Sequence, residues 1–181
     1  MLRIGSSPEL VLERLKQGHF PSLKTLRLWY NVRRPVDLED EKVLIDFLPT
    51  RFPTLQYLEL CRRWGHTFDA LEGRWDPLPL ACMLVSHLKE LRVFRFDPDL
   101  PGLQGYTPFT HRTKKYHETV GRLHEMASAI VKEAPWLTQI DMYCEFGLES
   151  DLYWEIWLVV QDDDGNVALD RPPPEIVDLW F

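Results

Sequence analysis

The sequence predicts an α/β fold in which short strands and helices alternate along the chain. Four segments repeat one apolar pattern, LxxLxL, and each follows a stretch with helical periodicity. Repeated helix–strand order requires parallel strands joined by crossovers. Because one such unit cannot bury its apolar side alone, it must stack on copies of itself. The four segments are Leu23–Leu28, Leu55–Leu60, Leu88–Val93 and Leu137–Met142.

The alternation within these strands decides between two architectures. A doubly wound sheet is covered on both sides, and its strands are continuous apolar runs. Here a charged residue stands between two apolar ones, as Arg27 does between Leu26 and Leu28. One side of the sheet therefore faces water. This favours a leucine-rich-repeat-like solenoid with parallel strands and with helices on its convex side.

Cap residues and proline set the predicted limits of the first two helices. Ser7 followed by Pro8 begins the first helix, and Gly18 ends it. Asp37 caps the second helix, and Pro49 is predicted to end it. Before the first helix, a short strand at residues 2–4 is the end of an earlier unit.

Apolar residues at steps of three and four predict two further helices. The third carries Leu80, Met83, Leu84 and His87 on one face. The fourth is the longest, and Pro135 follows its end. Its apolar face is formed by Tyr116, Val120, Leu123, Ala127 and Ile130.

The chain is predicted to be a single domain over residues 1–181, with repeats over about 1–145. A Pro- and Gly-rich segment at about 97–111 is an inserted loop. The C-terminal part, about 150–181, is a β-hairpin cap. In it, strand Trp154–Val160 is followed by the turn Asp162–Asn166 and the returning strand Val167–Leu169.

Composition excludes several classes of function. The net charge of −7, from 21 basic and 28 acidic residues, argues against binding to nucleic acid or to an anionic membrane surface. No apolar run approaches the roughly 20 residues of a membrane-spanning helix. Three separated cysteines and no signal-peptide pattern predict an intracellular protein, cytoplasmic or nuclear. No metal or cofactor motif is recognised, since His117 and His124 lie two helical turns apart.

Residues on the solvent-facing side of the predicted sheet are the candidates for partner binding. Equivalent residues of stacked strands form columns. One column is charged and is either a register-setting stripe or a ladder of weak surface ion pairs. Its residues are Arg3, Arg27, Glu59, Arg92 and Asp141. The next column, which we call the aromatic column, either anchors a partner or is covered by the loop at 97–111 or the C-terminal tail. Its residues are Trp29, Cys61, Phe94 and Tyr143. The predicted contacts are Arg27, Trp29, Tyr57, Glu59, Arg92, Phe94, Asp141 and Tyr143.

Two of the units resemble those of a known family. Residues 20–28 (FPSLKTLRL) and 52–60 (FPTLQYLEL) resemble the F-P-x-L-x-x-L-x-L units of fungal F-box/leucine-rich-repeat proteins, and residues 134–137 (APWL) are a looser copy. The resemblance covers the repeat region only and includes no F-box. It implies that the repeats hold a substrate protein for a ubiquitin ligase. A cullin-ligase adaptor would be a partner only if an F-box lies upstream.

The sequence therefore predicts a non-catalytic protein-interaction module that binds a protein on the concave sheet face. The narrower expectation is the substrate-recognition repeat region of an F-box-type ubiquitin ligase subunit that lacks its F-box. Two alternatives stay open. One is a small α/β enzyme with its site at the carboxyl ends of the strands, near Asn31, Arg63, Phe96 and Glu145. The other is an orphan fragment with no function of its own.

Overall fold

The computed structural model describes residues 2–20, 22–64, 76–98, 114–146, 151–172 and 175–177. Helices and strands alternate from the N-terminus to β5, as the repeats predict. The helices in this part of the chain are α1 (Pro8–Gln17), α2 (Pro35–Arg51), α3 (Pro77–His87) and α4 (Lys114–Glu133). The strands are β1 (Leu2–Ser6), β2 (Thr25–Val32), β3 (Tyr57–Trp64), β4 (Val93–Phe96), β5 (Gln139–Phe146), β6 (Asp151–Gln161), β7 (Val167–Asp170) and β8 (Glu175–Val177).

The described strands form one open, mixed sheet. Their order is β1-β2-β3-β4-β5-β6-β7, with β8 paired to β6. Strands β1 to β5 are parallel, whereas β6 runs antiparallel to β5, and β7 and β8 run antiparallel to β6. The α/β prediction is confirmed, and the predicted C-terminal hairpin is formed by β6 and β7. The predicted loop at 97–111 lies almost entirely outside the described residues.

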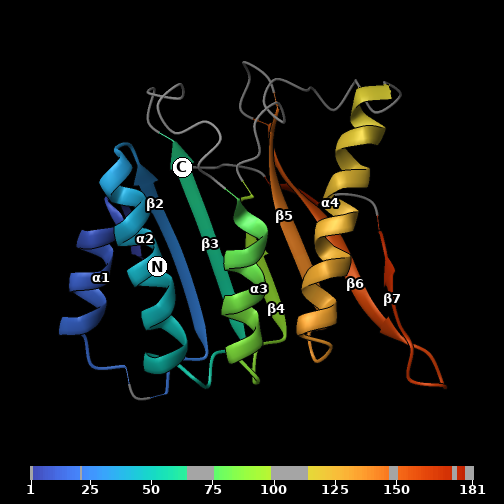
Figure 1. The fold of residues 1–181 in the computed structure, drawn as a ribbon, viewed down its shortest axis with the longest axis horizontal. Coiled ribbons are helices and arrows are strands. Elements are labelled where there is room, and N and C mark those ends of the chain that lie inside the picture. The colour runs from blue at the N-terminus through green and yellow to red at the C-terminus, as the bar shows by residue number, and fades with distance from the viewer. Residues whose placement is uncertain are drawn as a thin grey trace.

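All four described helices lie on one side of the sheet (Figure 1). The main core fills the space between them, because alternate strand residues point toward the helices. Leu28, Leu58 and Ile140 from the sheet are at most 1% exposed, as are Leu44 and Leu123 from the helices. We call the opposite side of the sheet the helix-free face. On β2 to β5 it carries Arg27, Trp29, Tyr57, Glu59, Arg95 and Asp141.

The first helix begins and ends where its sequence signals predict. Ser7 is the N-cap of α1, and its hydroxyl oxygen accepts the N–H of Leu10 at 3.5 Å. Pro8 occupies the first turn, where a missing N–H costs nothing. Gly18 closes the helix.

The limits of α2 differ from the prediction at both ends. Asp37 lies inside the first turn and not at the N-cap, because its carboxylate reaches back to the N–H groups of Arg33 and Arg34 at 2.8 and 2.9 Å. At the other end, the helix continues past Pro49 to Arg51. The proline removes only its own hydrogen bond, and the N–H of Phe52 still reaches the carbonyl of Leu48 at 2.8 Å.

Strand β4 has a register that the sequence pattern misassigned. Leu58 pairs with Phe94, which in turn pairs with Ile140. Leu91, predicted to be on this rung, precedes the strand and occupies the place of Leu55. The prediction aligned this unit three residues too early. The physical reason is that Leu88, Leu91 and Phe94 are apolar residues spaced three apart, and both Leu91 and Phe94 are followed by an arginine and a second apolar residue, so more than one alignment satisfies the pattern.

None of the helices in the described part of the chain is both long enough and apolar enough to span a membrane.

Candidate functional site

The helix-free face carries six of the eight predicted contact residues, and the register of β4 removes the other two. Phe94 points to the helix side, is 1% exposed and stacks on Phe96 with the ring centroids 5.0 Å apart. Arg92 lies before the strand, where its guanidinium donates to backbone carbonyls including that of Trp136. Arg95, which the prediction overlooked, takes the place between Glu59 and Asp141.

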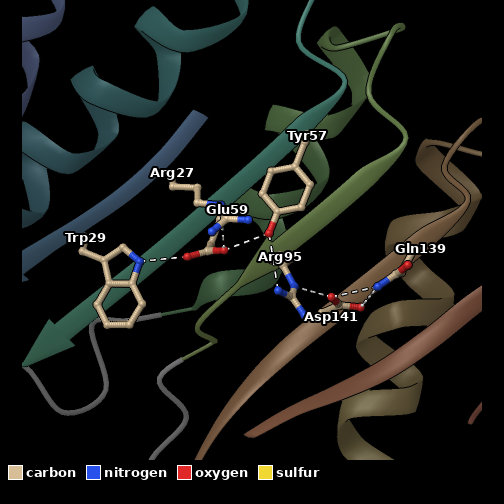
Figure 2. A network of polar contacts seen from close by, with 7 residues as sticks. All are labelled: Arg27, Trp29, Tyr57, Glu59, Arg95, Gln139 and Asp141. Carbon is tan, nitrogen blue, oxygen red and sulfur yellow. Dashed lines mark hydrogen bonds and ion pairs between the residues drawn. The ribbon is translucent and has the colours of Figure 1, made fainter. Parts of the chain in front are cut away.

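Glu59 of β3 is the acceptor for aromatic donors from two strands. Its Oε1 accepts the indole N–H of Trp29 at 2.8 Å, and its Oε2 accepts the hydroxyl of Tyr57, also at 2.8 Å. Arg27 Nε lies 3.6 Å from Oε2. The carboxylate is thereby held in one orientation at 4% exposure (Figure 2).

Asp141 of β5 is the second acidic centre and is fully buried. It accepts a hydrogen bond from Arg95 Nε and two from the Gln139 amide, at 2.8 and 3.0 Å. Arg95 also donates to the Tyr57 hydroxyl at 3.4 Å, which joins the two centres. Four neighbouring strands therefore share one polar network, as Figure 2 shows.

The titratable groups of this network have shifted pKa values. Burial raises the pKa of Tyr57 to about 12, and the Glu59 carboxylate that accepts its hydrogen bond adds to the effect. Burial alone would lower the pKa of Arg95, but the Asp141 carboxylate and the Tyr57 oxygen outweigh it and hold that pKa above its usual range. Tyr57 is therefore neutral and Arg95 charged at physiological pH.

Arg27 is the one exposed residue among the seven of this network. This side chain is 43% exposed, and its guanidinium lies over the Tyr57 ring at 5.1 Å from the centroid. Among the described residues it makes no hydrogen bond, and its ion pair is the long contact with Glu59. Arg27 therefore presents N–H donors to solvent.

The aromatic column is only partly available for contact. Tyr143 and Trp154 form an edge-to-face pair with centroids 5.2 Å apart, and at 7% and 3% exposure both are buried with Cys61. Trp29 packs against this cluster and stays partly exposed. Tyr143 is therefore buried, as the second alternative expected, and among the described residues Trp154 and Cys61 pack against it. The loop and the tail named in that alternative lie largely outside the described residues.

Sequence reasoning missed Arg95, Gln139 and Trp154. For Arg95, the available signal was the alternation Phe94-Arg95-Phe96, which fits the apolar–charged–apolar pattern of the other strands as well as Leu91-Arg92-Val93 does. Gln139 was placed in its column but not recognised as a partner of Asp141. Trp154 pairs with Tyr143 between the antiparallel strands β6 and β5, and the repeat pattern does not predict the register of that pair.

A second polar cluster lies on the helix side of the sheet. Glu41 of α2 accepts the Tyr30 hydroxyl at 2.7 Å and lies 2.9 Å from Arg62 Nε, with Glu41 and Arg62 at most 2% exposed. Burial raises the pKa of Glu41, and Arg62 and Tyr30 oppose that shift only in part. Burial, with Glu41 as the next cause, also raises the pKa of Tyr30.

We compare this cluster with the predicted enzyme site at the carboxyl ends of the strands. A cavity of about 30 Å³ beside it is lined by Tyr30, Arg62, Phe96 and Asp97 together with apolar side chains. Such a volume holds one or two water molecules. Asn31 is partly exposed, and the side chains of Arg63 and Glu145 lie outside what the structure describes.

Within the described residues, no three His, Cys, Asp or Glu side chains are grouped so that they could hold a metal ion. The comparisons with known proteins add no relative. The chain matches no protein-family model, no curated protein and no solved structure. A functional proposal therefore depends on the chain's own residues.

Proposed function

We propose that this chain is a non-catalytic protein-interaction module that binds its partner on the helix-free face. The observation that supports the proposal is the polar network, which fixes side chains from four strands on a sheet side without described helices. Ordering these side chains before binding removes an entropic cost that a partner would otherwise have to offset.

The exposed members of this face are the residue types that contribute most to protein interfaces. Arginine, tryptophan and tyrosine are enriched among the residues whose truncation weakens binding most. Arg27 is exposed, and Trp29 and Tyr57 are partly exposed beside it. Glu59 and Asp141 act as positioning residues, since both are buried.

The finer architecture belongs to the same proposal. Parallel strands in chain order, with helices on one side, are what a leucine-rich-repeat-like solenoid would have, and its concave side would be the helix-free face. The narrowest form of the proposal is substrate recognition within an F-box-type ubiquitin ligase. It is supported only by the resemblance of the FPxLxxLxL units.

Quantitative affinity purification with the full chain as bait tests the proposal. The Arg27→Ala variant removes an exposed side chain that makes no described hydrogen bond, so the fold should be retained. Lys42→Ala is the matched control, because it removes one positive charge, 61% exposed, from a helix on the other side of the sheet. We expect proteins enriched by the unmodified chain to be lost from Arg27→Ala and retained by Lys42→Ala.

Equal recovery with all three baits would reject the helix-free face as the binding surface. The ubiquitin-ligase form has a separate outcome in the same experiment. If the bait carries the upstream coding sequence and no cullin-ligase adaptor is enriched, that form is rejected while protein binding on this face stands.

A further inference from the structure

A cleft of about 640 Å³ lies between α2 and α3, on the opposite side of the sheet from the polar network. This volume is within the range of about 300–1,000 Å³ found for small-molecule sites. Its lining comprises five apolar and four charged residues, all from the two helices or the α3 N-cap. They are Pro35, Leu38, Pro79, Leu80 and Met83, and Glu39, Lys42, Asp46 and Asp76.

The cleft follows from how the two helices are placed. They approach each other toward their C-terminal ends and are further apart near their N-terminal ends (Figure 1). The α2 lining residues recur at steps of three and four, so one side of that helix forms a wall over about three turns. Leu38, Leu80 and Met83 pack against the main core and provide an apolar surface.

The charges around the cleft favour a cation. Three carboxylates face one ammonium group, and Lys42 is already 3.1 Å from Glu39. The carboxylate of Asp76 caps α3 by accepting the N–H of Leu78 at 3.2 Å, which offsets the partial positive charge of that helix end. In α2, the carboxylate of Asp37 in the first turn likewise places a negative charge near the helix start. Asp46 makes no hydrogen bond or ion pair with the other described residues, so its charge is available.

We propose that this cleft binds a small organic cation. The apolar body of the ligand would lie on Leu38, Leu80 and Met83, and its ammonium group would pair with Asp46. This site is separate from the helix-free face, and the proposal does not depend on the protein-binding function.

Three probes that differ only in their polar end test the assignment: 4-phenylbutylamine, 4-phenylbutanol and 4-phenylbutyrate. Each is titrated into the ¹⁵N-labelled full chain, and amide chemical shifts are followed by NMR. Molecules this small are expected to bind with dissociation constants of about a millimolar. We expect the amine to shift amides of α2 and the first turns of α3, the alcohol to bind more weakly, and the carboxylate to bind weakest.

The variant Asp46→Asn identifies the charge responsible. It should weaken binding of the amine by about fivefold, as expected for one lost ion pair at a solvated site, and leave the alcohol unchanged. Asp40→Asn, on the same helix but outside the lining, is the matched control and should behave like the unmodified chain. Raising the ionic strength should weaken only the amine.

Three results would overturn the proposal. The first is the absence of amide shifts in α2 and α3 with the amine at about ten times the expected dissociation constant. The second is equal binding of all three probes, which would show an apolar cleft with no preference for cations. The third is equal loss of amine binding in Asp46→Asn and Asp40→Asn.

Discussion

Replacing Asp141 by asparagine tests whether the network on the helix-free face stabilises the fold as a buried ion pair. The substitution keeps the size of the side chain but removes its charge. Arg95, whose side chain is 14% exposed, then loses its carboxylate partner. Breaking a buried pair in this way costs about 3–5 kcal/mol. Because the asparagine oxygen still accepts one hydrogen bond, we expect a loss of about 3 kcal/mol in the free energy of unfolding.

This loss corresponds to a measurable change in melting temperature. For a chain of 181 residues, each kcal/mol lost from the free energy of unfolding lowers Tm by about 2–4 °C. Asp141→Asn should therefore melt about 6–12 °C below the unmodified chain. Calorimetry gives Tm, and urea unfolding followed by tryptophan fluorescence gives the free energy. Asp163→Asn, in the exposed turn after β6, is the control and should change stability by less than about 0.5 kcal/mol.

A double variant separates the ion pair from its packing. Arg95→Met combined with Asp141→Leu replaces both charges by apolar side chains of similar size, and such replacements of buried pairs are often neutral. We expect it to be more stable than Asp141→Asn. The reasoning would be refuted if Asp141→Asn lost less than about 1 kcal/mol, since a buried guanidinium would then tolerate the loss of its partner.

Three further predictions concern other parts of the fold. Phe94→Ala should lower the free energy of unfolding in urea by about 3–5 kcal/mol, and Arg92→Ala by less than about 1 kcal/mol. A larger loss in Arg92→Ala than in Phe94→Ala would support the register that the sequence predicted for this strand. Burial raises the pKa of Asp37, but hydrogen bonds from Arg34 and from the N–H groups of Arg33 and Arg34 together hold it below the usual value. Its stabilisation is therefore present above about pH 4 and lost as pH falls through the folded-state pKa, so Asp37→Asn should cost about 1 kcal/mol at pH 7 and progressively less below pH 4. Arg62→Met leaves the carboxyl of Glu41, whose pKa burial already raises, without its cation. When the folded-state pKa of an acid is raised, the free energy of unfolding falls as pH rises. We therefore expect the free energy of unfolding of Arg62→Met, measured by denaturation between pH 5 and 8, to fall more steeply with pH than that of the unmodified chain. Adding Glu41→Leu to this variant should remove the steeper fall.

The local signals in the sequence located most of the helices and strands. Ser7 and Gly18 set the two ends of α1 through contacts within one helical turn. The helical periodicity of Leu123, Ala127 and Ile130 is likewise visible in a short stretch of sequence. The limits of α2 were less accurate, because Asp37 and Pro49 each allow more than one position relative to the helix end.

The part of the candidate site on β2 and β3 was predictable for the same reason. Arg27, Trp29, Tyr57 and Glu59 lie on two strands whose units carry the same Phe-Pro start, so their shared face and register follow from the alignment. The third unit has Lys89 where the others have proline, and its alignment was ambiguous. Phe94 was therefore assigned to the wrong side of the sheet, and Arg95 was overlooked.

The sequence by itself determined the alternation of helices and strands and the existence of one charged side of the sheet, because both depend on residues close together in the chain. The tertiary structure decided which residues meet across strands. The pairing of Arg95 with Asp141, the burial of Tyr143 against Trp154 and the cleft between α2 and α3 each join segments distant in sequence. Only the folded arrangement sets their separation, and a shift of register moves every side chain of a strand relative to its neighbours.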